Sequence, residues 1–214
     1  MNWQQDPAPR TRESELAQVT RWTLEFLPAD GVFLDVGGNI GLVSEKVKLA
    51  CPGVTVHLFE PIPRLAALAR KRLAGLPGVT VNELGLSDVA GDADIITVEP
   101  DNPGWSTLDQ TYAAPGRVVT RVKLARLDDY PLDRLDAIKL DVEFWEGKVL
   151  KGGRKTIDRF LPAIVSELSR GSEDLWYERV GEMERLFDLG YKRVDYRVKG
   201  RCNVVFEPPA KVRP

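Results

Sequence analysis

One stretch, Val32-Phe-Leu-Asp-Val-Gly-Gly-Asn-Ile-Gly41, constrains the fold of this chain more than any other. It begins as a short apolar strand, enters a glycine-rich turn and continues as a helix. Gly37 and Gly38 can adopt backbone angles closed to other residues and present bare N–H groups, and Gly41 lets the following helix lie close to the strand. Asp35 stands at the carboxyl end of the strand, where open α/β sheets bind ligands. The stretch therefore predicts a ligand-binding junction.

The spacing of this turn narrows the kind of ligand. It reads D-x-G-x-N-x-G from Asp35, which is neither the dinucleotide pattern G-x-G-x-x-G nor a phosphate loop with its Lys-Ser/Thr. Glu60 closes a second strand about twenty residues further on, where a doubly wound fold places the carboxylate that holds a ribose diol. A strand-end acid at the surface is the alternative for Glu60 taken alone. The glycine turn and Glu60 together favour a ligand that contains a ribose and no pyrophosphate.

The composition limits the class of protein. A length of 214 residues suits one domain, and a formal net charge of -2 supplies no general attraction for nucleic acid or an anionic membrane. Two cysteines and one histidine make a disulfide framework or a zinc cluster improbable. The N-terminus lacks a leader pattern, and no stretch reaches the roughly 20 apolar residues of a membrane span. We expect a cytoplasmic protein with a small neutral partner.

Strand and helix patterns alternate along the chain. An amphipathic helix over 13–27 precedes the first strand and should pack over the sheet edge or the site. Helices from Gly41 and from Pro63 alternate with strands over 54–59 and 79–81, which predicts a parallel sheet. Later strands are expected over 137–142 and 162–165, helices over 146–151 and around 176–187, and a closing hairpin over 191–206. The residues 93–98 and 117–124 predict an inserted hairpin that could wall a pocket.

A run of alternating charged and apolar residues ends the strand over 137–142. The period of two would place Lys139, Asp141 and Glu143 on one face, where unpaired charges are unfavourable to bury. They form an ion-pair network, face solvent, or serve a substrate. In the functional interpretation Asp141 or Glu143 takes a proton from a substrate hydroxyl and Lys139 positions it.

Other chemistry-bearing side chains give weaker signals. His57, the single histidine, lies within a strand and should pack against a helix rather than reach the ligand crevice. Trp105, Trp145 and Trp176 could line an apolar pocket, although lone aromatic side chains usually belong to the core.

The motifs, taken in order, resemble the FkbM-type family of methyltransferases. The resemblance rests on Asp35-Val-Gly-Gly-Asn-Ile-Gly41, Phe59-Glu-Pro-Ile-Pro63, Ile138-Lys-Leu-Asp-Val-Glu143 and Val149-Leu-Lys-Gly152, with the Leu-Gly-Leu-Ser-Asp88 turn, Arg126-Leu-Asp-Asp-Tyr130, Leu189-Gly-Tyr191 and Asn203-Val-Val-Phe206. It implies a doubly wound, mostly parallel seven-stranded sheet of the Rossmann-like class I methyltransferase type, with a reversed last strand. The implied division is an N-terminal helical segment, residues 1–28, and a methyltransferase domain, residues 29–208.

The resemblance also implies a cofactor and a reaction. S-adenosylmethionine would donate a methyl group, usually to a hydroxyl of a sugar or natural product. By position, the methionine part of the cofactor would be held by Asp35, Gly37, Asn39 and Gly41, the ribose by Glu60, and the adenine by the turn with Ser87 and Asp88. Asp141, at the end of the strand next but one to the glycine turn, is the expected proton acceptor, or a ligand to Mg²⁺ together with Glu143.

One position departs from the family pattern. The family usually has Asp-Val-Glu-Gly-x-Glu, whereas this chain has Phe144 in place of the glycine. Glycine there would supply an unusual backbone angle or room for a ligand, so Phe144, with Trp145, is expected on the acceptor side. The alternatives to a small-molecule O-methyltransferase are a non-catalytic cofactor-binding protein, because of Phe144, and a nicotinamide-dependent oxidoreductase, which the glycine spacing disfavours. The sequence identifies neither the acceptor nor the oligomeric state.

Overall fold

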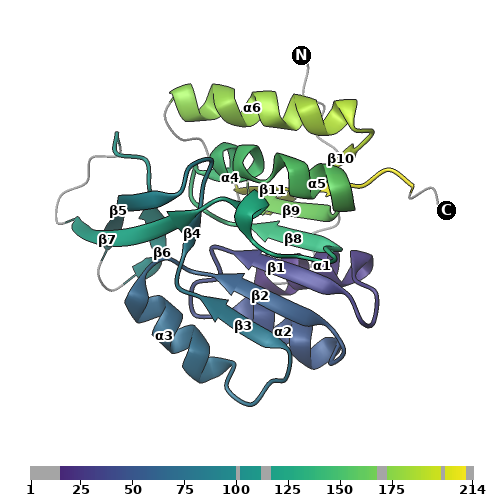
Figure 1. Cartoon of the computed structure of the whole chain (residues 1–214), viewed down its shortest axis with the longest axis horizontal. Helices are drawn as coiled ribbons and strands as arrows, with labels where there is room; N and C mark the ends of the chain where they lie inside the picture. The colour runs from purple at the N-terminus through teal and green to yellow at the C-terminus, as the bar shows by residue number, and fades with distance from the viewer. Residues whose placement is uncertain (1–14, 100–101, 112–116, 168–172, 199–200, 211–214) are drawn as a thin grey trace.

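The computed structural model describes residues 15–99, 102–111, 117–167, 173–198 and 201–210, and its centre is a seven-stranded sheet. The strand order is β10-β11-β9-β8-β1-β2-β3, and all neighbours are parallel except β11, which is antiparallel to β9 and β10 (Figure 1). The predicted doubly wound sheet with a reversed last strand is confirmed. Its strands are β1 (Val32–Val36), β2 (Thr55–Phe59), β3 (Val79–Asn82), β8 (Ala137–Leu140), β9 (Ala163–Glu167), β10 (Lys192–Val198) and β11 (Arg201–Glu207).

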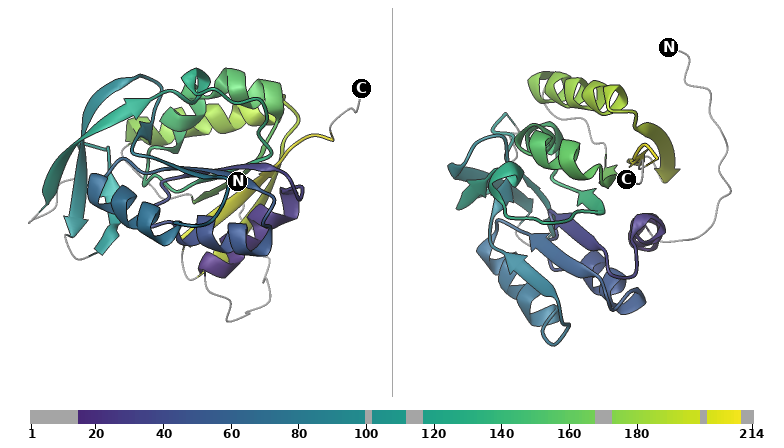
Figure 2. Two further views of the ribbon diagram at one scale, coloured as in Figure 1. Left: turned by 60° about the horizontal axis from the view of Figure 1, so that its bottom comes forward. Right: turned by 45° about the vertical axis from the view of Figure 1, so that its right-hand side comes forward.

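Helices cover both faces of this sheet, so that the sheet lies between two helical layers (Figure 2). One layer holds α1 (Glu15–Phe26), α2 (Leu42–Ala50) and α3 (Pro63–Arg72), and the other holds α4 (Glu146–Gly152), α5 (Arg154–Phe160) and α6 (Glu173–Asp188). The central strands are apolar in both directions because both of their faces are covered.

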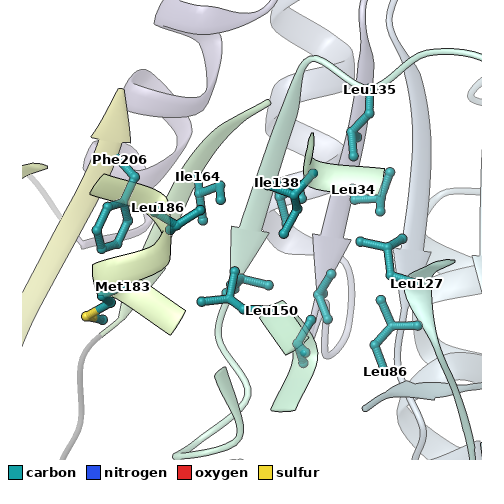
Figure 3. Packing of buried hydrophobic residues seen from close by; sticks show 14 of the residues in the cluster. Leu34, Leu86, Leu127, Leu135, Ile138, Leu150, Ile164, Met183, Leu186 and Phe206 are labelled. Carbon is teal, nitrogen blue, oxygen red and sulfur yellow. The ribbon is translucent and has the colours of Figure 1, made fainter. Parts of the chain in front are cut away.

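Two apolar clusters fill the space between the layers. Leu34, Ile138 and Ile164 point to the layer of α4, α5 and α6, where they meet Leu150 and Leu186 (Figure 3). The residues next to them on the strands point to the other layer and meet α1 and α2, the cluster consisting of Val19, Trp22, Phe33, Val43, Val47, Val54, Val56, Ala137, Val165 and Val205. The helix α1 therefore covers the sheet near β8 and β9, rather than the sheet edge or the site, the two positions that the sequence suggested.

A second, four-stranded sheet is inserted between β3 and β8. Its order is β4-β7-β5-β6, formed by β4 (Gly85–Leu86), β5 (Gly91–Glu99), β6 (Asn102–Thr107) and β7 (Val118–Ala125), and a 3-10 turn η1 (Leu127–Asp129) follows. The two strands expected from the sequence are β5 and β7, and their antiparallel pairing confirms them, but the segment between them contains a further strand, β6, rather than a plain loop. The strands β4 and β6 were not foreseen. The small sheet projects beside one end of the main sheet (Figure 1).

The helix expected over 146–151 is α4, which ends at Gly152 with Gly153 as its C-cap, and the further helix α5 that begins after Gly153 was not foreseen. The expected strand order was wrong, since β8 lies directly beside β1 rather than next but one. The Asp141 that follows β8 is consequently closer to the glycine turn than predicted.

A candidate active site at the carboxyl ends of the parallel strands

A cavity of about 270 Å³ opens at the carboxyl ends of β1, β2 and β8. This is close to the lower end of the range for small-molecule sites, roughly 300 to 1,000 Å³. The small sheet supplies part of its wall through Ser106 and Leu108. The other residues that line it are Val36, Gly37, Asn39, Phe59, Glu60, Pro61, Ile62, Leu65, Gly85, Leu86, Asp141, Val142, Glu143 and Trp145.

The glycine turn is shaped by the neighbouring strand ends. Gly37 has φ 72°, and a Cβ atom there would lie 1.8 Å from the carbonyl oxygen of Asp141. Only glycine fits, because β1 and β8 are immediate neighbours. The N–H groups of Gly37 and Gly38 both donate to the carbonyl oxygen of Phe59, at 3.0 and 3.1 Å. The bare N–H groups expected from the sequence are thus engaged within the protein, and the turn is fixed to the end of β2.

Glu60 lines the cavity while being almost fully buried, with 5% of its surface exposed. Its Oε2 accepts the N–H of Asn39 at 3.0 Å, and its Oε1 accepts the N–H of Ile62 at 2.9 Å. Burial raises the pKa of this carboxyl to about 7, although the two N–H groups and the charge of Lys139 act in the opposite direction. Each carboxylate oxygen can accept a second hydrogen bond, so Glu60 can still bind a pair of hydroxyls.

Asp35 and Lys139 form a buried ion pair beneath the turn. Lys139 Nζ lies 3.0 Å from Asp35 Oδ1 and 3.1 Å from the carbonyl oxygen of Gly37, and Asp35 Oδ2 accepts the hydroxyl of Ser44 at 2.7 Å. Neither Asp35 nor Lys139 is among the residues that line the cavity. Their contacts join β1, β8 and α2. Of the three roles that the sequence left open for Lys139, the structure therefore shows the ion pair.

The segment after β8 forms one side of the cavity. Asp141 Oδ2 lies 3.6 Å from Lys139 Nζ, and the Asp141 side chain is 40% exposed. The strand alternation stops there, because Glu143 and Phe144 have φ 44° and φ 79°, in the left-handed region. The prediction that Glu143 shares a strand face with Lys139 and Asp141 is therefore wrong. Glu143 and Trp145 line the cavity, but Phe144 is not among the lining residues.

Ser87 and Asp88 lie behind this wall, outside the set of lining residues. Ser87 is completely buried, and its hydroxyl accepts the indole N–H of Trp145 at 3.2 Å. Asp88 lies 3.4 Å from Lys148 Nζ and 3.1 Å from Lys151 Nζ. Burial by itself would raise the pKa of Asp88, but the two lysines outweigh it and lower this pKa. The turn expected to hold an adenine is thus turned toward α4.

His57 lies away from the cavity. Its Nδ1 is 3.0 Å from the hydroxyl oxygen of Tyr130, the two rings meet edge to face, and burial lowers the pKa of the imidazole. The ring therefore packs against a residue that follows η1 and not, as predicted, against a helix. The side chains of Trp105 and Trp176 lie outside the described part of the structure.

Sequence reasoning missed the apolar lining. Pro61 and Ile62 directly follow Glu60, so their place after a strand end was an available signal. The insert was expected to wall a pocket, and it does so through Ser106 and Leu108, but no local pattern indicated that these two residues would line it.

A model of the family described as "Methyltransferase FkbM domain" matches residues 35–198. The chain belongs to this family. The match begins at Asp35 and includes every segment that lines the cavity.

Individual proteins agree with this membership. The methyltransferase sdnD of Sordaria araneosa is 33% identical over 162 residues, covering 59% of this chain and 61% of that protein. The 31-O-demethyl-FK506 methyltransferase FkbM of Streptomyces tacrolimicus is 32% identical over 167 residues, covering 62% of both chains. The chain thus matches less than two thirds of the length of either relative. The solved structure of SMU.1697c from Streptococcus mutans in complex with SAH has a TM-score of 0.61 at 10% identity, covering 93% of this chain and 100% of that chain. The class I methyltransferase fold implied by the sequence is confirmed.

The described residues lack two features that would bear on function. They contain no group of three or more His, Cys, Asp or Glu side chains that could hold a metal ion. No helix among them has the length and apolar character needed to cross a membrane.

Proposed function

We propose that this protein transfers a methyl group from S-adenosylmethionine to a hydroxyl of a small molecule. The observation that carries the proposal is the cavity of an FkbM-family chain, in which Glu60, the glycine turn and Asp141 meet at adjacent strand ends. Methyltransferase relatives, one named for an O-methyl position, support the reaction class.

The residues of the cavity fit the parts of this cofactor. Glu60 has the free acceptor capacity for a ribose diol, and the apolar side chains of Ile62, Leu86 and Leu108 suit the faces of an adenine. Gly37 and Asn39 border the remaining space, where the methionine part would lie. When bound, the cofactor supplies a methyl group already attached to a good leaving group, so the protein needs mainly to align the acceptor oxygen.

Asp141 is the proposed proton acceptor in this reaction. Its carboxylate lines the cavity and is partly exposed, so it can receive the proton of an acceptor hydroxyl. Lys139 holds Asp141 and Asp35 in place and is a positioning residue in this proposal. Glu143 lines the same side and can accept hydrogen bonds from further hydroxyls of the acceptor.

Phe144 does not favour the non-catalytic alternative. It adopts φ 79°, the conformation that glycine would take without strain, so the backbone of the turn keeps a glycine-like shape. A magnesium-dependent version, with Asp141 and Glu143 as ligands, is tested by chelation and restoration with magnesium. The division into segments 1–28 and 29–208 stays a prediction from the sequence.

Binding and turnover together test the proposal. Titration calorimetry with S-adenosylhomocysteine (SAH) should show binding and titration with NAD should not. A screen of hydroxylated acceptors with S-adenosylmethionine should then reveal methyl transfer that Glu60→Gln reduces. Binding of NAD alone, or absence of SAH binding by folded protein, would overturn the proposal.

A further inference from the structure

One hydroxyl of the small sheet binds the segment after β8. Thr107, the last residue of β6, donates its Oγ1 hydrogen to the carbonyl oxygen of Glu143 at 2.7 Å. The Oγ1 of Thr107 also accepts the N–H of Asp109 at 3.0 Å, and Thr107 is buried. The Thr107 hydroxyl therefore both donates and accepts a hydrogen bond, and the donated one joins two elements far apart in the sequence.

The carbonyl that Thr107 binds belongs to a strained turn. Glu143 and Phe144 follow one another with φ 44° and φ 79°. A left-handed backbone brings the Cβ atom too close to the carbonyl oxygen in residues other than glycine, so two such residues in succession need support from their surroundings. A glycine at position 144 would remove the strain at that residue.

The same hydrogen bond joins two segments that line the cavity. Ser106 and Leu108, on either side of Thr107, are lining residues, and so are Asp141 and Glu143. A fixed distance between Thr107 and the Glu143 carbonyl therefore fixes these two segments relative to each other.

We propose that Thr107 is a positioning residue, whose hydroxyl holds the left-handed Glu143–Phe144 turn in the shape that the cofactor cavity requires. The inference builds on the proposed function, because it takes the cavity to be the cofactor site. It also explains how this chain maintains the turn with a phenylalanine in place of the glycine that its family usually has there.

A double-mutant cycle with SAH affinity as the readout tests this. Thr107→Val should weaken SAH binding by about 2- to 10-fold, the range that one net hydrogen bond supports. Thr107→Ser keeps the hydroxyl and should bind SAH within about twofold of the parent, which is less than the loss expected for Thr107→Val. Thr23→Val is the matched control, because Thr23 is equally buried but its hydroxyl binds the carbonyl of Val19 within α1.

The decisive comparison uses Phe144→Gly as background. If Thr107 supports the strained turn, Thr107→Val should have much less effect once glycine removes the strain. An equal loss of affinity in both backgrounds would mean that Thr107 acts only on the small sheet and would overturn the inference, as would unchanged affinity in Thr107→Val. If the parent protein binds no SAH, the proposed function fails. Urea unfolding of the parent, Thr107→Val, Phe144→Gly and the double variant still decides whether Thr107 and Phe144 are coupled.

Discussion

Lys139 Nζ lies 3.0 Å from Asp35 Oδ1 and joins the ends of β1 and β8 directly beneath the glycine turn. Both side chains are buried, with Asp35 completely so. Burial alone would lower the pKa of Lys139, but the charges of Asp35 and Asp141 outweigh it and raise this pKa above its ordinary value. The ammonium group therefore stays charged and supports the turn from below.

Lys139→Met should strongly destabilise the protein, because it leaves the Asp35 carboxylate buried without its cation. Breaking a buried pair by removing one partner costs roughly 3 to 5 kcal/mol. Urea unfolding measures the change. The exposed pair Arg121–Asp94 supplies the control, since Arg121→Met should cost less than about 1 kcal/mol. Similar losses from both substitutions would show that the Lys139 pair contributes no more than a surface contact.

Binding of SAH should strengthen as the pH rises toward 8. A ribose diol donates to the ionised carboxylate of Glu60, whereas the pKa of this carboxyl is raised to about 7 in the free protein. Affinity should fall by close to tenfold per pH unit below this pKa and level off above it. Calorimetry between about pH 5.5 and pH 8, a range that includes the raised pKa of Glu60, measures this dependence. Glu60→Gln should bind weakly at every pH, and an unchanged slope in that variant would assign the effect to another group.

The same carboxyl should make the free protein less stable as the pH rises. Burial raises its pKa from 4.5 to about 7, so the folded protein binds the proton more tightly than the unfolded chain does. The contribution is complete below the unfolded pKa, is lost as the pH rises through about 7, and amounts to about 3 kcal/mol at most. Urea unfolding at several pH values, compared with Glu60→Gln, should show this loss only in the parent. Parallel curves for the two proteins would contradict the assignment.

Asp141→Asn should damage methyl transfer far more than His57→Ala. Loss of a general base typically reduces turnover about 10²- to 10⁴-fold. His57 is engaged with Tyr130 and lies outside the cavity lining, so its removal should leave turnover near that of the parent. Initial rates with an identified acceptor decide the matter. An inactive, folded His57→Ala beside an active Asp141→Asn would identify the histidine as the base.

Asp88→Asn should leave SAH affinity within about twofold of the parent, less than the loss expected for one hydrogen bond. The carboxylate is held by Lys148 and Lys151 of α4, and Ser87 rather than Asp88 touches the indole of Trp145. Calorimetry with SAH measures the affinity. A loss comparable to that in Glu60→Gln would show instead that Asp88 contacts the adenine, as the family resemblance implies.

Most helices and strands were predicted correctly because each is specified by residues within or next to it. The apolar strand before Gly37 and the Pro63 that begins α3 act within a few residues of themselves. Glu60 was placed at the cavity because its position depends only on the end of β2.

The remainder of the site depends on pairings across the chain. The role of Lys139 follows from Asp35, 104 residues earlier, and the place of Ser87 follows from the indole of Trp145, 58 residues later. The left-handed turn at Phe144 could not be recognised either, because nothing local indicates that a phenylalanine will adopt an angle typical of glycine.

The pairing of β1 with β8 also orders events during folding. The Glu60 side of the cavity comes from a local unit, β1-α2-β2, and can form as soon as these residues are available. The Asp141 side requires closure of a loop of about a hundred residues, an entropic step that slows the formation of non-local contacts. During synthesis, Asp35 therefore leaves the ribosome long before Lys139 does. Until Lys139 is available, the Asp35 carboxylate has water in place of its cation. The residues of the small sheet precede Lys139, so the centre of the sheet can close only after they have been synthesised.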